Sequence, residues 1–79
     1  MKELLLYIAQ NLVDSPDEVT VTERDEGDKT VYELRVASND MGKVIGRHGK
    51  IAKEIRTLMR AMAQKQGRHI SVDIMDTAE

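Results

Sequence analysis

The sequence contains no cysteine, phenylalanine or tryptophan, and these absences narrow both its fold and its chemistry. Without cysteine there is no disulfide framework, no thiolate nucleophile and no zinc site that uses cysteine. A small domain without such crosslinks is typical of a reducing compartment, so we expect a cytoplasmic protein. Tyr7 and Tyr32 are the only aromatic residues. The core must therefore be aliphatic, and a surface of stacked aromatic rings is disfavoured.

Long hydrophobic segments are also missing. The apolar run Leu4–Ala9 is far shorter than the roughly 20 residues that span a bilayer, and Glu3 interrupts what would be the charged head of a signal peptide. With 79 residues, 41% hydrophobic and 33% charged, the chain is expected to form one soluble domain over residues 1–79. We expect its last residues, 76–79, to form a frayed tail.

Positive charge is concentrated in one segment. The formal net charge is −2, but the segment from Lys43 to His69 carries +7 and the rest of the chain −9. Glu54 is the one anion of that segment, and its eight cations are Lys43, Arg47, Lys50, Lys53, Arg56, Arg60, Lys65 and Arg68. A mildly acidic chain with one basic stretch predicts local binding of a polyanion. The alternative is an ordinary solvated helix face.

Hydrophobic periodicity predicts three helices and three strands. A 3.6-residue period indicates helices and strict alternation indicates strands. In chain order we expect a helix over 1–13, strands over 19–22 and 31–36 joined by an acidic turn, helices over 41–45 and from 49 to Gly67, and a strand over 69–74. This order predicts an α+β fold with three helices packed on one face of a three-stranded sheet.

Two further details follow from local signals. Ser38, Asn39 or Asp40 is expected to cap the short helix, and Gly67 to end the long one. The predicted apolar face of the long helix consists of Ile51, Ile55, Leu58, Met59 and Met62, with Ala52 and Ala63 at its edges.

The segment Val44–Lys50 carries the most specific chemical signal, two glycines three positions apart between two helices. Gly46 can adopt a positive φ and turn the chain, while Gly49 lets a ligand approach the start of the second helix, where free N–H groups favour an anion. Arg47, His48 and Lys50 add positive charge. The pattern predicts a phosphodiester site, although glycines in such hairpins also serve only to turn the chain.

Other kinds of site are disfavoured. The spacing from Gly42 to Gly49 does not fit a P-loop, and no dinucleotide fingerprint occurs, so nucleotide hydrolysis is not expected. His48 and His69 lack the spacing and companion ligands of a metal site. We therefore predict no catalytic residue, no metal, no cofactor and no small-molecule substrate.

The residues Val44–Lys50, followed by Ile55 and Leu58, resemble the VIGxxG signature of KH domains of type II. The longer block Gly42–Leu58 is similar to the small bacterial single-KH proteins of the KhpA (YlqC-like) family, which have about this length. The resemblance implies that the GxxG loop clamps about four nucleotides of single-stranded RNA. The RNA-binding residues that we assign on this basis are Lys43, Ile45, Gly46, Arg47, His48, Gly49, Lys50 and Lys53.

The same resemblance implies partners and a cellular role. Proteins of this family are described as cytoplasmic RNA chaperones that act after transcription, self-associate or pair with the larger KH protein KhpB (Jag or EloR), and affect cell-wall homeostasis and cell length. We expect a dimer, either of two copies or with such a partner, formed around Thr57 and Met62 of the long helix. Two alternatives stay open: a helix-turn-helix DNA-binding domain, and a protein-interaction subunit with a vestigial GxxG.

Overall fold

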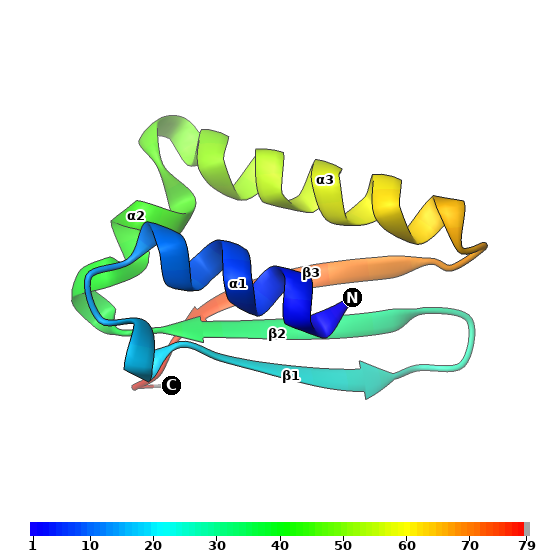
Figure 1. Cartoon of the computed structure of the whole chain (residues 1–79), viewed down its shortest axis with the longest axis horizontal. Helices are drawn as coiled ribbons and strands as arrows, with labels where there is room; N and C mark the ends of the chain where they lie inside the picture. The colour runs from blue at the N-terminus through cyan, green and yellow to red at the C-terminus, as the bar shows by residue number, and fades with distance from the viewer. Residues whose placement is uncertain (79) are drawn as a thin grey trace.

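Three helices cover one face of a three-stranded sheet, as Figure 1 shows, which confirms the α+β fold class. The computed structural model describes residues 1–78. The helices are α1 (Lys2–Leu12), α2 (Met41–Ile45) and α3 (Lys50–Lys65), and the strands are β1 (Thr20–Asp25), β2 (Thr30–Val36) and β3 (Ile70–Asp76). In this part of the chain, no helix has both the length and the apolar character needed to cross a membrane.

The sheet is mixed, with β2 in its centre. β1 pairs with β2 in antiparallel fashion through a hairpin, whereas β3 runs parallel to β2 because α2 and α3 carry the chain back across the sheet. Tyr32, Leu34 and Val36 of β2 point to the helices and are almost completely buried, while Glu33 and Arg35 alternate to the other face. Apart from Tyr32, the buried cluster is aliphatic, as the composition predicted.

Both outer strands are longer than expected. β1 continues through the polar residues Glu23–Asp25 because β2 offers a hydrogen-bonding partner over its whole length. β3 extends to Asp76, which pairs with Val36, so the expectation of a frayed tail from residue 76 is wrong. The Thr77 N–H donates to the Val36 carbonyl at 3.0 Å. The last residue of that predicted tail, Glu79, lies outside the described residues.

Asp76 is also held by side-chain hydrogen bonds. The Ser38 hydroxyl and then the Ala78 backbone N–H, 2.7 Å from Asp76 Oδ1, lower the pKa of this carboxyl below its ordinary value. The end of the sheet is therefore tied to the turn that follows β2.

The buried face of α3 is rotated relative to the expected one. Ala52, Ile55, Met59 and Ala63 point into the core, so the alanines lie within this face rather than at its edges. Leu58 is 46% exposed. Small side chains in the contact let the helix approach the sheet closely, which turns Leu58 outwards.

The C-terminus of α3 forms as predicted. Gly67 has a φ of +67°, and the N–H groups of Gly67 and Arg68 donate to the carbonyls of Gln64 and Ala63. Together these two hydrogen bonds form a Schellman motif.

Asp40 joins two distant parts of the chain instead of capping α2. No side-chain cap is formed at this helix. The completely buried carboxylate accepts hydrogen bonds from the backbone N–H groups of Asp14, at 3.2 Å, and Ser15, at 3.0 Å. Asp40 therefore fixes the end of α1 against the beginning of α2.

We predict that Asp40→Ala lowers the free energy of unfolding by about 2–4 kcal/mol, because two part-buried amides lose their acceptor. Urea denaturation measures the change. Asp40→Asn, which keeps one carbonyl acceptor, is expected to have an intermediate effect, and Asn39→Ala in the same turn serves as the exposed control. Equal stabilities of Asp40→Ala and Asn39→Ala would contradict the role of the carboxylate.

Candidate nucleic-acid interface

The chain between α2 and α3 turns through three residues with positive φ, Gly46, His48 and Gly49. Gly46 has φ +76° and ψ 177°, which confirms the expected positive φ, and Gly49 has φ +74°. His48 lies between them at φ +57° and is the only non-glycine residue with positive φ in residues 1–78. Histidine tolerates this conformation better than most side chains. The turn lifts residues 47–49 away from both helices as a short exposed loop.

The two glycines have different surroundings. A Cβ at Gly46 would lie 2.6 Å from Ile51 Cγ1, so the first turn of α3 packs directly against this backbone. A Cβ at Gly49 would have no neighbour within 4 Å. Gly46 therefore closes the packing between the helices, whereas Gly49 leaves the outer side of the loop open to a ligand.

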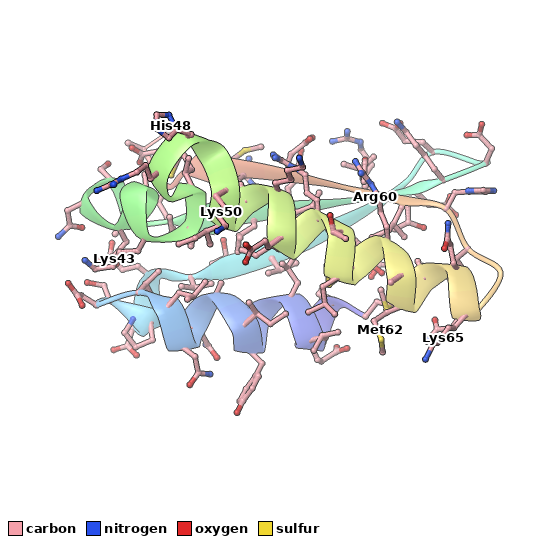
Figure 2. All side chains as sticks on the ribbon, turned by 90° about the horizontal axis from the view of Figure 1, so that it is seen from above. Lys43, His48, Lys50, Arg60, Met62 and Lys65 are labelled. Carbon is pink, nitrogen blue, oxygen red and sulfur yellow. The ribbon has the colours of Figure 1, made fainter. Side chains whose placement is uncertain are left out.

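The charges of the loop are exposed and unneutralised. Arg47, His48 and Lys50 are exposed, and Figure 2 shows His48 at the top of the loop with Lys50 at the start of α3. Within residues 1–78, no carboxylate lies at ion-pair distance from any of the three. No side chain caps the N-terminus of α3, whose backbone amides and dipole favour an anion.

Lys43, Ile45 and Lys53, which were also assigned from the sequence, lie outside the loop. Lys43 Nζ lies 3.4 Å from Asp14 Oδ2, and Figure 2 shows Lys43 on the α1 side of the molecule. Its charge is thus partly neutralised and directed away from His48. Ile45 is partly buried against the core, and Lys53 is exposed one turn into α3.

One side of α3 carries two cations that the sequence assignment did not include, Arg56 and Arg60, beside Lys53, which it did include. Lys53, Arg56 and Arg60 follow each other at helical spacing on the side that faces β3, and Figure 2 shows Arg60 there, with Met62 on the opposite side next to α1. The Arg56 Nε–H donates to the Val72 carbonyl of β3 at 3.0 Å. The four-residue spacing of Arg56 and Arg60 in the sequence could have predicted that both lie on the same side of the helix.

On the face of the sheet that the helices do not cover, in contrast, charged side chains pair with one another. Arg24 lies 2.9 Å from Glu26 and 2.8 Å from Glu33, and Arg35 lies 3.6 Å from Glu33. The hydrogen bond from the Thr22 hydroxyl, followed by that from Arg24, lowers the pKa of Glu33, while the bonds to Glu26 and then Glu33 raise the pKa of Arg24. Unpaired positive charge is therefore concentrated on the loop and on α3.

The outer crest of α3 is apolar. Thr57 and Ala61 are exposed beside Leu58, and a shallow depression of about 570 Å³ is lined by Lys50, Lys53, Glu54, Thr57, Leu58 and Ala61. A second depression of about 270 Å³ lies between α1 and α3, where Leu12 and Leu58 are the exposed large side chains. Of the residues expected at a dimer interface, Thr57 is exposed and Met62 is partly buried.

No group of three histidine or acidic side chains that could hold a metal ion occurs among residues 1–78.

Known proteins share this sequence and this fold. The family model described as "KhpA/KhpB, KH domain" matches residues 2–74. A protein of Clostridium acetobutylicum named RNA-binding protein KhpA is 51% identical over 75 residues, which cover 95% of this chain and all of the relative. Proteins of the same name from Halalkalibacterium halodurans and Treponema pallidum are 49% and 48% identical and are covered to 100% and 94% of their lengths, with 96% and 95% of this chain.

Among solved structures, Era in complex with MgGDPNP and a segment of 16S ribosomal RNA aligns with 95% of this chain at a TM-score of 0.65 and 21% sequence identity. This chain spans only 29% of that protein, so the likeness concerns the fold. The family match spans residues 2–74, which include the loop and all helices and strands except the last two residues of β3. The chain belongs to the KhpA/KhpB family of KH domains.

Proposed function

We propose that this protein binds single-stranded RNA and holds the phosphate backbone in the loop Gly46–Gly49. The observation that carries the proposal is an open loop whose basic side chains, Arg47, His48 and Lys50, have no carboxylate partner within residues 1–78. Such a loop suits a phosphodiester, and KH domains clamp about four nucleotides in this way. The names of the relatives, which are RNA-binding proteins, support the same conclusion.

The alternative of a helix-turn-helix domain on duplex DNA fits the structure less well. A recognition helix in the major groove needs polar side chains that reach base edges. The outer crest of α3 instead presents Leu58 and Ala61. A short loop with exposed basic side chains fits a single strand better.

The apolar crest of α3 is the surface that we propose for a protein partner. Ile55, Met59 and Ala63 are buried, so the surface is narrower than the sequence suggested and consists of Thr57, Leu58, Ala61 and the exposed part of Met62. Its occupant is a second copy or the KH domain of a KhpB-type protein. The proposed cellular role, that of a cytoplasmic RNA chaperone linked to cell-wall homeostasis and cell length, rests on the family resemblance.

Charge reversal in the loop tests the RNA site. Arg47→Asp with His48→Asp is expected to weaken binding of oligouridine about tenfold or more, because carboxylates replace donors beside a phosphate. Aspartate tolerates the positive φ of position 48, so the fold is retained. Fluorescence anisotropy measures the affinity and circular dichroism the fold.

A control variant separates a local from a general electrostatic effect. Lys2→Asp with Lys29→Gln changes the net charge by the same amount at exposed positions away from the loop. It is expected to bind RNA nearly as the wild type does. Equal losses in both variants, or full affinity of the folded loop variant, would contradict the assignment of the site.

The dependence of the RNA affinity on salt concentration reports the number of phosphate contacts. With three to four contacts to a tetranucleotide, log K is expected to fall against log[salt] with a slope of about −2 to −3, at roughly −0.7 per contact for single strands. Titrations at several potassium chloride concentrations measure the slope. A slope near zero would show that uncharged contacts dominate.

Light scattering tests the partner surface. We expect a mass of twice 8.9 kDa at high protein concentration, and a return to 8.9 kDa in Leu58→Lys, which places a charge on the apolar crest. Tyr7→Lys is the control, because Tyr7 is also a large exposed residue but lies on α1. A wild-type mass of 8.9 kDa at all concentrations would exclude self-association through this surface.

A further inference from the structure

The loop contains one side chain of a type that changes its charge near neutral pH, His48. Histidine side chains ordinarily gain or lose a proton between pH 5 and 8. The neighbouring arginine and lysine, Arg47 and Lys50, are of types that stay charged throughout this range. The chain has only one other histidine, His69, which directly precedes β3 at the opposite end of α3. The charge of the loop can therefore be set by the protonation of a single residue.

The backbone fixes His48 at the outer end of the loop. Its φ of +57° lies between the positive φ values of Gly46 and Gly49, and the Gly49 N–H donates to the Gly46 carbonyl at 3.2 Å, which closes the turn. The side chain is exposed, and Figure 2 shows it at the edge of the molecule. A phosphate that approaches the open side of Gly49 therefore also meets the imidazole ring of the preceding residue.

The free loop offers no counter-charge to a protonated imidazole. The loop packs against α2 and α3. The charged side chains of α2 and of residues 50–54 of α3 are Lys43, Lys50, Lys53 and Glu54. Lys43 is turned towards Asp14, and Glu54 borders the apolar depression on the crest of α3. Within residues 1–78, no carboxylate lies at ion-pair distance from His48. A bound phosphate would supply the negative charge that the protein itself does not provide.

We propose that binding of RNA at the loop is coupled to the uptake of a proton by His48. The inference rests on the proposed function and adds a regulatory property to the same site. A neutral imidazole has one N–H donor and no charge, whereas the protonated ring has two donors and a positive charge, so a phosphate oxygen binds the protonated form more tightly. By linkage, the RNA affinity rises as the pH falls and becomes constant once His48 is protonated in both the free and the bound protein.

The affinity for a short oligouridine, measured by fluorescence anisotropy between pH 8 and pH 5.5 at constant ionic strength, tests the coupling. The oligouridine is made without a terminal phosphate, because the second proton of a phosphate monoester dissociates near pH 6. Carboxylates ordinarily stay ionised down to pH 5.5. We expect the wild type to bind about three- to tenfold more tightly at pH 5.5 than at pH 8, which corresponds to about one charge-assisted hydrogen bond. Equal affinities at the two pH values would overturn the inference.

Two histidine variants locate the proton. His48→Asn removes the titrating ring and keeps a residue type that tolerates positive φ, so the turn is retained. It is expected to bind RNA at every pH about as the wild type does at pH 8. His69→Asn makes the same change at the other exposed histidine and is expected to keep the full pH dependence. A pH dependence that persists in the folded His48→Asn variant would overturn the assignment of His48.

Calorimetry detects the proton directly. Titration of RNA into the protein near pH 6.8, in two buffers with different enthalpies of ionisation, gives the number of protons taken up on binding. A three- to tenfold change in affinity corresponds to an uptake of about 0.3 to 0.5 proton by the wild type, and none is expected for His48→Asn. RNA binding without proton uptake contradicts only the coupling. Absence of RNA binding at every pH contradicts the proposed function and, with it, the coupling.

Discussion

The close packing of Ile51 against the backbone of Gly46 is the contact on which the candidate site depends. α2 has only five residues, and the chain must leave it and begin α3 within four more. Ile51 occupies the space that any other side chain at position 46 would need. The angle between the two helices, and with it the direction of the loop amides, is therefore set by packing within the protein before any ligand arrives. Preorganisation of this kind reduces the ordering cost of binding.

α3 has three sides with different surroundings. Its inner side packs on the sheet through small and flexible side chains, its side towards β3 carries unpaired cations, and its outer crest is apolar. The proposed RNA and partner surfaces thus use mostly different residues. Lys50 and Lys53 are the exception, because they also border the apolar depression. A partner on the crest would come close to the phosphates at the loop, so the two binding events are expected to influence each other.

Local signals in the sequence were sufficient for the helices around the loop, because a positive φ at Gly46 or a Schellman motif at Gly67 depends on neighbours in the chain. The roles of Asp40 and Lys43 were not predictable in this way, since their partners, Asp14 and Ser15, are about 25 residues or more away in the sequence. The length of β1 and the orientation of α3 likewise depend on the strand and sheet that they meet. Arg60 could have been assigned from its four-residue spacing to Arg56.

The overall negative charge of the protein does not prevent it from binding a polyanion, because charges act over short distances in salt. The Debye length is about 8 Å at physiological ionic strength, while the molecule measures 35 × 22 × 19 Å. The carboxylates at the hairpin tip are therefore largely screened from the loop. For binding of a polyanion, what matters is whether each cation is already paired with a carboxylate. Arg24 and Arg35 form ion pairs with Glu26 and Glu33. Arg56, in contrast, is held by a backbone carbonyl, and Arg68 is held by hydroxyl groups. An arginine fixed by a neutral acceptor gains a defined position and keeps its charge for a ligand.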